Sequence, residues 1–243
     1  MKISLIIPMY NESGIIEDTA KKIYKYMEET FEDYEVIFVD DGSRDGSAEI
    51  VSALGLPNVR VCGYGGNKGK GAAVRHGMLE ADGDVVMFTD ADLAYGTEVI
   101  KRVYDIFDAE PDTKMITGSR NLHKDGYDGY TILRKIMSKV YIKVLCFVGG
   151  FKLSDSQCGC KAFRSDTARE IFSRCEVNGF AFDFEAILWA GILGYKIYEM
   201  PVKIINHRDS KINVIRDTLR MLSDLRKIKK DVKIKAKDLQ KSE

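Results

Sequence analysis

Two aspartates separated by a single residue, Asp90 and Asp92, follow the apolar residues 85–88, which have the pattern of a buried strand. Carboxylates at this spacing at a strand end can face one point outside the sheet. Close like charges are unfavourable unless a cation lies between them, so the pair favours a hard divalent ion such as Mg²⁺ or Mn²⁺. A diphosphate would supply further oxygen ligands. The structural alternative is a helix cap, because an aspartate before a helix is a common arrangement.

A second acidic pair, Asp40 and Asp41, ends the largely apolar run at residues 35–39 and precedes Gly42 and Ser43. One carboxylate could accept hydrogen bonds from a nucleoside base or ribose while the other orients the loop. Capping of the following helix explains the pair equally well. Two acidic strand ends that face each other favour a metal and nucleotide site over two unrelated caps.

The segment Asn67-Lys-Gly-Lys-Gly71 leads from a loop into a helical pattern. Its glycines could let backbone N–H groups approach a phosphate, and its two lysines add positive charge. The segment does not match the Walker pattern, and no G-x-G-x-x-G follows the first strand. The sequence therefore gives little support to an ATPase or an NAD-dependent dehydrogenase.

The first 120 residues alternate β-branched runs with longer stretches of helical periodicity, which predicts an α/β fold with a mostly parallel sheet and helices on both faces. We expect strands at 2–7, 35–40, 59–62, 84–90 and 114–118, and helices at 15–30, 43–54, 69–81 and 96–108. In such sheets ligands bind beyond the carboxyl ends of the strands. Polar residues gather there, at 10–12, 40–42, 90–92 and 118–120.

The second half is less regular. We expect helices at 131–148, 182–193 and 212–230, strands at 157–163 and 196–205, and a frayed end. Residues 131–152 hold five Lys or Arg and no acid. One side of the helix at 131–148 is apolar and the other carries a lysine ladder: Leu133, Ile136, Val140, Val144 and Phe147 against Lys135, Lys139 and Lys143. This pattern fits a helix at a membrane interface, and it fits equally a helix packed on the domain with solvated lysines.

Composition excludes several classes of protein. The 37 Lys and Arg balance the 37 Asp and Glu of the 243 residues, so overall charge does not favour nucleic-acid binding. The longest apolar stretches fall short of the roughly 20 residues that span a bilayer, and the N-terminus lacks the pattern of a signal peptide. Five cysteines without a secretion signal indicate reduced thiols, and Cys158 and Cys160 lack the partner pair of a zinc site.

Eight segments together resemble a known family. Those in the first half are Pro8-Met-Tyr-Asn-Glu12, Val39-Asp-Asp-Gly-Ser43, Asn67-Lys-Gly-Lys-Gly71, Asp90-Ala-Asp92-Leu93 and Gly118-Ser-Arg120. This set is similar to family 2 glycosyltransferases, and more narrowly to the dolichyl- or polyprenyl-phosphate sugar synthases. The resemblance extends to about residue 213, closest to the glucosyltransferase and mannosyltransferase branch, through Gln157–Phe163, Phe180–Glu185 and Ser210-Lys211-Ile212.

The resemblance implies a GT-A (Rossmann-like) nucleotide-sugar-binding fold and an inverting transfer from a nucleotide sugar to a lipid phosphate. It implies a nucleoside pocket lined by Pro8, Tyr10, Glu12, Val39 and Asp41. Asp90 and Asp92 would hold Mg²⁺ or Mn²⁺ on the donor diphosphate, with the Ala91 backbone against the sugar nucleotide. Phosphate groups would meet basic residues, for which the candidates are Lys68, Arg120, Lys211 and either His207 or Arg208.

For catalysis, the metal and the cations Arg120 and Lys211 would stabilise the charge that develops on the leaving group. A lipid phosphate is already anionic, so a strong general base is not required. Asp183 is the acid expected to orient the acceptor or act as base, and Glu185 is second. Their structural alternative is a pair of acids at a helix start, which the helix dipole favours.

The sequence departs from the mannosyltransferase pattern, because Leu93-Ala94-Tyr95 stands where relatives often carry a polar residue that helps bind metal. This departure weakens an assignment of mannose, and the Gln157–Phe163 segment resembles the glucosyltransferase branch, so the resemblance favours UDP-glucose as donor over GDP-mannose. We expect a catalytic domain at 1–205 and a basic amphipathic segment at 206–243. The expected enzyme is peripheral on the cytoplasmic membrane face, where a membrane protein could recruit it. The alternatives are a transferase with a saccharide acceptor and a non-catalytic nucleotide-sugar-binding scaffold.

Overall fold

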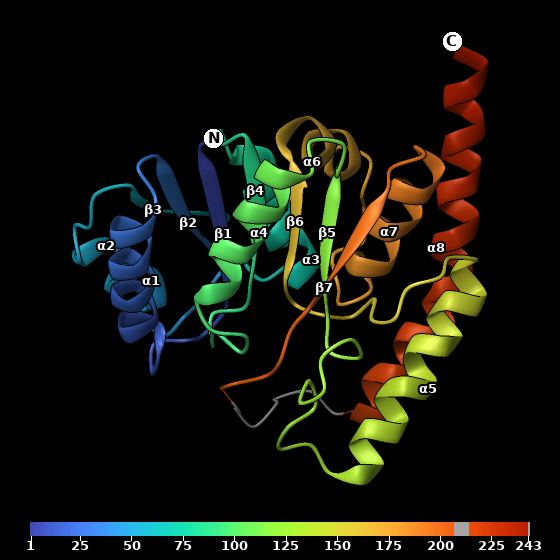
Figure 1. Ribbon diagram of the computed structural model, residues 1–243, viewed down its shortest axis with the longest axis horizontal. Helices are drawn as coiled ribbons and strands as arrows, with labels where there is room; N and C mark the ends of the chain where they lie inside the picture. The colour runs from blue at the N-terminus through green and yellow to red at the C-terminus, as the bar shows by residue number, and fades with distance from the viewer. Residues whose placement is uncertain (207–213, 243) are drawn as a thin grey trace.

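The computed structural model describes residues 1–206 and 214–242 (Figure 1). Its strands are β1 Ile3–Met9, β2 Tyr34–Asp40, β3 Val59–Gly63, β4 Val85–Phe88, β5 Met115–Ser119, β6 Lys161–Arg164 and β7 Ile197–Pro201. Its helices are α1 Ile16–Thr30, α2 Ser47–Ala53, α3 Lys70–Glu80, α4 Glu98–Ala109, α5 Ile132–Gly149, α6 Ser165–Phe172, α7 Phe182–Ile192 and α8 Val214–Ser242.

The described strands form one sheet in the order β3-β2-β1-β4-β6-β5-β7. Every pair is parallel except those of β6, which runs antiparallel to both β4 and β5. This is the mostly parallel α/β sheet that the sequence predicts. Because β1, β2 and β4 are parallel neighbours, their carboxyl ends lie at one edge of the sheet, below the strands in Figure 1.

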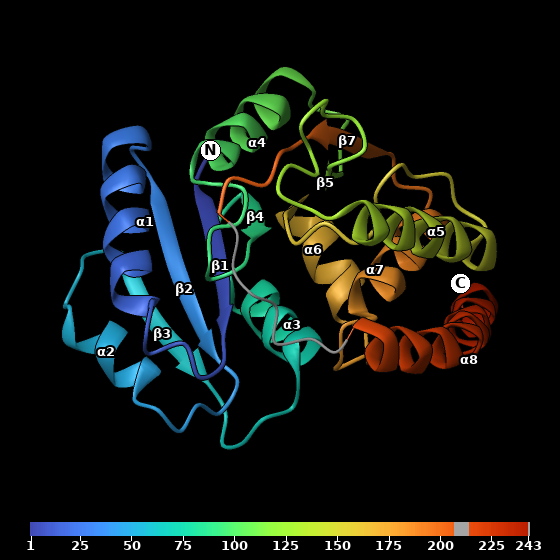
Figure 2. The same cartoon turned by 90° about the horizontal axis from the view of Figure 1, so that it is seen from below.

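Helices cover both faces of the sheet. Side chains alternate between the faces along each strand, and the strands are apolar at successive positions, so both faces need covering. In β1, Leu5 and Ile7 face a core shared with α1, α2 and α4. The intervening Ile6 faces a second core with α3, α6 and α7. Figure 2 shows α1 and α4 on one side of the strands and α3, α7 and α8 on the other.

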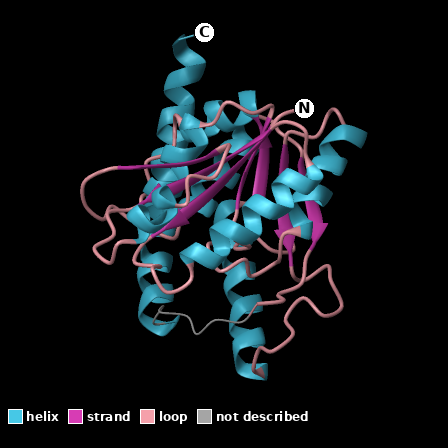
Figure 3. Ribbon diagram, turned by 90° about the vertical axis from the view of Figure 1, so that its left-hand side faces the viewer, coloured by secondary structure: helices cyan, strands magenta, loops and turns pink. Residues whose placement is uncertain are grey.

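Helix α8 packs on this second core through Leu225, Ile228 and Val232, beside α5 and α7. In Figure 3 it is the helix that ends at the label C. The expected frayed end is wrong, because the helix continues to Ser242. Good helix formers (Lys, Ala, Leu and Gln) follow residue 230, and burial of Val232 adds a tertiary contact. Within the described residues, the sequence also left α6 unpredicted, and β6 begins only at Lys161, four residues later than the pattern suggested.

Candidate active site

The two aspartates of the Asp-x-Asp motif lie in a tight turn that follows β4. Leu93 has a φ of +49°, a conformation that side chains with a Cβ rarely adopt. The Leu93 amide donates to Asp90 O at 3.0 Å, and the Ala94 amide donates to Asp92 Oδ1 at 3.0 Å. The second bond shows that Asp92 also stabilises the local turn.

Two distant segments hold this turn in place. The Asn206 side chain, in the segment that follows β7, donates to Asp92 O at 3.3 Å and to Leu93 O at 2.9 Å. On the other side, Thr19 Oγ1 of α1 donates to Ala91 O at 2.8 Å. The conformation of the motif is therefore fixed by long-range contacts.

Asp90 is paired with a lysine from another element. Lys70 begins α3 and its Nζ donates to Asp90 Oδ1, with side chains 25% and 30% exposed respectively. Burial opposes the charge on Lys70, but attraction to Asp90 and the hydrogen bond outweigh it and raise the lysine pKa. Gly159 lies so close that a Cβ there would overlap Asp90 Oδ2. Any larger residue at position 159 would therefore displace the Asp90 carboxylate.

Asp183, at the start of α7, forms a second buried ion pair. Its Oδ1 lies 2.8 Å from Lys161 Nζ, and the lysine side chain is fully buried. At this distance the ammonium is the charged partner of the carboxylate. Burial raises the pKa of Asp183, while Lys161 and Lys70 act in the opposite direction. The same electrostatic neighbourhood includes Asp90, so Asp183 belongs to the centre formed by the Asp-x-Asp turn.

Glu185 has a different environment from Asp183. Its carboxylate accepts the amides of Glu176 and Val177, with closest distances of 2.9 and 2.8 Å. Burial raises its pKa, and these amides oppose the shift. Glu185 thus holds the loop before α7, which carries Asn178.

Asp41 organises the loop before α3. Its carboxylate accepts hydrogen bonds from Tyr64 Oη, from the Asn67 side chain and from the amides of Lys68 and Gly69, at 2.8–2.9 Å for the shortest contact of each. The residue is buried. The two acidic strand ends therefore differ. The Asp41 carboxylate accepts hydrogen bonds from the loop before α3, whereas the Asp90 carboxylate lies at the candidate site.

The expectation that amides of this glycine loop cradle a phosphate is wrong. The Lys68 and Gly69 amides are bound to Asp41, and those of Gly71 and Ala72 donate to Asn178 O at 2.8 and 3.2 Å. The glycines serve close packing instead, since a Cβ at Gly69 would lie 2.5 Å from Asn178 O.

Arg120 follows β5 and is held by a carboxylate. Its Nε and Nη2 donate to the two oxygens of Asp155 at 2.6 and 3.0 Å, and its amide donates to Asp155 Oδ2 at 3.2 Å. Asp155 is completely buried. Burial opposes charge on Arg120, but Asp155 outweighs it and raises the pKa well above the ordinary value. The guanidinium is fixed and permanently charged.

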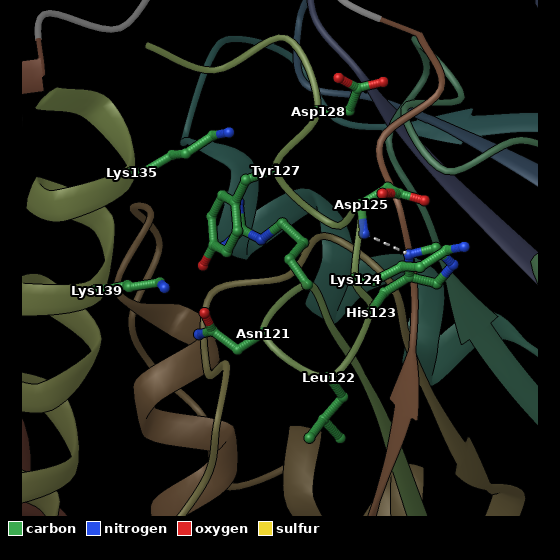
Figure 4. Close-up of a pocket in the computed structure, with 10 residues that line it drawn as sticks. Asn121, Leu122, His123, Lys124, Asp125, Tyr127, Asp128, Lys135 and Lys139 are labelled. Carbon is green, nitrogen blue, oxygen red and sulfur yellow. Dashed lines mark hydrogen bonds between the residues drawn. The ribbon is translucent and has the colours of Figure 1, made fainter. Parts of the chain in front are cut away.

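Arg120 lies at a cleft of about 580 Å³ between α5 and the loop that follows β5. The lining residues are Arg120, Asn121, Leu122, His123, Lys124, Asp125, Tyr127, Asp128, Lys135 and Lys139. In Figure 4, Lys135 and Lys139 extend from α5 toward the loop that carries Asn121 and Tyr127. Four basic side chains against the two carboxylates of Asp125 and Asp128 give the cleft a net cationic lining, which suits an anionic ligand.

Comparison with known proteins gives this arrangement a family. Residues 4–172 match the family described as Glycosyl transferase family 2. The chain belongs to glycosyl transferase family 2. The dolichyl-phosphate β-glucosyltransferase of Dictyostelium discoideum is 30% identical to it, covering 93% of this chain and 73% of that protein. The dolichyl-phosphate β-glucosyltransferase of Drosophila melanogaster has the same identity and coverage.

Solved structures confirm that this glycosyltransferase has a GT-A fold. Glucosyl-3-phosphoglycerate synthase from Mycobacterium tuberculosis, with Mn²⁺, UDP and glucosyl-3-phosphoglycerate, aligns at a TM-score of 0.66 and 17% identity, covering 92% of this chain and 78% of that chain. Mannosyl-3-phosphoglycerate synthase from Rubrobacter xylanophilus aligns at 0.70 and 18%, covering 94% and 73%. The resemblance inferred from the sequence motifs is therefore confirmed at the level of family and fold.

The residues predicted for the glycosyltransferase's nucleoside pocket have unequal access. Tyr10 is 42% exposed, and Pro8 and Glu12 are half-buried at the end of β1 and in the loop after it. Val39 is fully buried, backbone included, and its side chain lies in the core. Lys68 is exposed, with its Nζ 4.3 Å from the centre of the Tyr64 ring. These roles stay predictions.

Two of the predicted cations, Arg208 and Lys211, and the alternative His207 lie outside the described residues. The sequence analysis missed Asp155 and Lys161, which pair with Arg120 and Asp183. Asp155 lies in a loop and Lys161 at the start of β6, so no periodic pattern in the sequence marks either residue as functional. Burial alone distinguishes them, because a fully buried charge requires a partner.

Proposed function

We propose that this glycosyltransferase moves glucose from UDP-glucose to a dolichyl or polyprenyl phosphate at a membrane surface, with Mg²⁺ or Mn²⁺ bound at the donor. One observation carries the acceptor assignment. A cationic cleft at Arg120 is bordered by α5, whose lysines line the cleft and whose apolar side chains are exposed. A ligand with a phosphate head and a hydrocarbon tail matches both. The names of the relatives support the same substrate class and sugar.

The residues around Asp90 fit a divalent ion held jointly with a diphosphate. Within residues 1–206 and 214–242, no group of three or more His, Cys, Asp or Glu side chains could hold a metal alone. Two hard carboxylate ligands with further oxygens from a nucleotide meet the preference of Mg²⁺ and Mn²⁺. We propose that Asp90 and Asp92 hold the ion. When bound, it would neutralise the charge that develops on the leaving diphosphate.

The reaction needs an anionic nucleophile and a stabilised leaving group. A phosphate oxygen of the acceptor would form a bond to the anomeric carbon of glucose as the bond from that carbon to UDP breaks, with inversion. Because the acceptor oxygen is already anionic, no proton has to be removed. Arg120 would position the acceptor phosphate, since Asp155 fixes its guanidinium at the cleft.

Asp183 would orient the transferred sugar. Its carboxylate shares an electrostatic neighbourhood with Asp90 and Lys70, beside the proposed donor site. A sugar hydroxyl that enters beside Asp90 would donate to this carboxylate. Lys161 keeps the carboxylate in place during this contact, at 2.8 Å.

Attachment to the membrane would use α5. Its predicted apolar face is exposed: Leu133 is 68%, Ile136 55%, Val140 55% and Phe147 88% accessible, and Val144 is half-buried. A different stripe, with Ile142 and Leu145, packs on the domain. None of the helices in the described ranges has the length and apolar character that a bilayer crossing requires.

We propose that the enzyme acts on the cytoplasmic face of the membrane. All five cysteines are free thiols, as is usual in a reducing compartment. A membrane protein could assist recruitment to this face.

A two-phase transfer assay tests the proposal. The protein, Mg²⁺ or Mn²⁺ and a polyprenyl phosphate are incubated separately with labelled UDP-glucose, UDP-galactose, UDP-GlcNAc and GDP-mannose. We expect label from UDP-glucose in the organic phase, lost on addition of EDTA. Label in the organic phase from GDP-mannose alone would overturn the assignment of glucose as the transferred sugar. Donor hydrolysis without label in the organic phase would overturn the lipid acceptor and direct attention to a soluble saccharide or other anionic acceptor.

A further inference from the structure

Lys70 is a cation beside the Asp-x-Asp turn to which the proposed reaction gives no task. It begins α3, and its ammonium lies among carboxylates, bonded to Asp90 and attracted also by Asp183 and Asp92. We propose that Lys70 occupies Asp90 in the free enzyme and moves onto the donor diphosphate when the divalent ion arrives, so that metal and nucleotide bind as a unit. This inference rests on the proposed metal-dependent donor site.

The contact places Lys70 in competition with a metal ion. Its Nζ donates to Asp90 Oδ1, an oxygen of a proposed metal ligand. A divalent ion bound to that carboxylate would face an ammonium at hydrogen-bonding range, and two cations at this distance repel each other. Either the ion stays out or the ammonium moves away. Lys70 is therefore a surrogate cation for the metal-free site.

The ammonium can move while the helix stays fixed. Gly69 packs against Asn178, and the amide of Gly71 donates to Asn178 O at 2.8 Å, so the backbone on both sides of Lys70 is pinned. The side chain is 25% exposed, and a lysine has a flexible four-carbon stem. Lys161 is a useful contrast, because its side chain is fully buried and it also donates to Cys158 O at 2.7 Å. Lys161 is fixed and Lys70 is free to reorient.

A displaced Lys70 needs a new anion. The diphosphate that completes the metal coordination would lie beside the same carboxylates and would supply that anion. Metal binding without nucleotide then leaves an ammonium unpaired next to a divalent ion, whereas binding of both satisfies every charge. Thermodynamic linkage makes the effect reciprocal, so that UDP tightens Mn²⁺ binding by the same factor as Mn²⁺ tightens UDP binding.

Mn²⁺ affinity, measured from the electron paramagnetic resonance signal of the free ion, tests this directly. In the wild type we expect weak binding that UDP strengthens. In Lys70→Gln we expect Mn²⁺ alone to bind about tenfold tighter or more, the factor that corresponds to removing a competing charge-assisted hydrogen bond. The factor by which UDP strengthens Mn²⁺ binding should shrink in the variant. Lys70→Met, which keeps most of the aliphatic stem, should behave alike.

Lys114→Gln is the matched control, because Lys114 forms an ion pair with Asp166 at 3.1 Å on the β5–β6 side of the sheet and does not contact the proposed ligands. It should bind Mn²⁺ as the wild type does. Equal or weaker Mn²⁺ binding in folded Lys70→Gln and Lys70→Met without UDP would overturn the role of Lys70. No Mn²⁺ binding by the wild type even with UDP would overturn the metal site itself, and the Lys70 role with it.

Discussion

At the scale of single residues, the site is built from ion pairs between distant parts of the chain. Lys70 pairs with Asp90, Lys161 with Asp183, and Arg120 with Asp155. The Lys161–Asp183 and Arg120–Asp155 pairs are buried, and removing one partner of such a pair costs about 3–5 kcal/mol. The segment from 155 to 161 supplies two of these partners and also Gly159, which packs against Asp90. This short segment therefore fixes the geometry of three chemically distinct groups.

Removal of a proposed metal ligand should separate binding from folding. In Asp92→Ala we expect turnover to fall about 10³-fold or more, because several kcal/mol of charge stabilisation is lost. UDP-dependent Mn²⁺ binding should fall with it, while circular dichroism stays as in the wild type. Asp108→Ala, a change at an exposed aspartate of α4, is the control. Turnover near the wild-type rate in Asp92→Ala would contradict the metal assignment.

The two acids at the start of α7 should respond differently to neutral replacement. Asp183→Asn should lower turnover about 10²-fold in the folded protein, because the proposed contact to the sugar needs a charged acceptor. It should also lower the free energy of unfolding, because the buried Lys161 loses its counter-ion. Glu185→Gln should keep turnover within about threefold but lower the free energy of unfolding by about 1.5–3 kcal/mol, since it weakens two bonds to amides. Parallel kinetics and chemical denaturation measure both. The reverse pattern would make Glu185 the catalytic acid.

The sequence was sufficient to select Asp90, Asp92, Arg120 and Asp183 as candidates, because their residue types and motif context carry chemical information. It could not show which residues form ion pairs with them. Asp155 lies 35 positions from Arg120, and such contacts are set by the antiparallel insertion of β6. The same limit explains why the Lys68 and Gly69 amides were assigned to a phosphate although Asp41 binds them.

At the scale of elements, the segment that follows β7 acts on the Asp-x-Asp turn. The Ile205 amide donates to Ala94 O at 2.8 Å, and Asn206 bonds the carbonyls of Asp92 and Leu93. Leu93 has a left-handed backbone, which costs about 1–2 kcal/mol and persists only where its surroundings impose it. Asn206 is therefore a positioning residue.

Loss of this clamp should affect chemistry more than stability. In Asn206→Ala we expect the free energy of unfolding to fall by about 1 kcal/mol and kcat/KM for the donor to fall about tenfold, because a misplaced turn misplaces both carboxylates. Mn²⁺ affinity in the presence of UDP should weaken in parallel. Asn206→Gln retains the donor amide and should recover part of the loss. Unchanged Mn²⁺ affinity in Asn206→Ala would contradict a positioning role.

The alternation of strands and helices was predictable at this scale because burial on both faces produces apolar runs of distinct length and period. The short α6 was not, since its eight residues follow β6 directly without a separating loop. The segment at 154–160 also escaped prediction. Its irregular chain donates to the side chains of Glu199 and of its own Asp155, and its Cys160 carbonyl accepts a hydrogen bond from the Gly118 amide of β5.

At the scale of the whole molecule, α5 connects the two kinds of surface that the proposed substrate requires. Its Lys135 and Lys139 line the cationic cleft (Figure 4), and most of its predicted apolar face is exposed. A membrane-bound phosphate could then reach Arg120 while its hydrocarbon tail stays in the lipid. Attachment and acceptor binding would be one event at one helix.

Charge reversal on this helix tests that coupling. Changing Lys135, Lys139 and Lys143 together to Glu should release the protein from vesicles that contain anionic lipid, because each basic residue near such a surface contributes about 1 kcal/mol. The apparent KM for the lipid phosphate should rise. Donor binding should not change, because these lysines do not contact the Asp-x-Asp turn. Vesicle sedimentation and the two-phase assay measure the two effects separately.

The control must alter net charge equally at another surface. Lys21, Lys25 and Lys101 lie on α1 and α4, which cover the opposite face of the sheet, and each forms an exposed i,i+4 ion pair. Such pairs contribute no more than about 1 kcal/mol each, so the triple change to Glu should leave the fold intact. If the two triple variants lose vesicle binding equally, overall charge attracts the protein to the membrane. If only the α5 variant loses it, α5 is the attachment site, and retention by both would contradict membrane attachment through the α5 lysines.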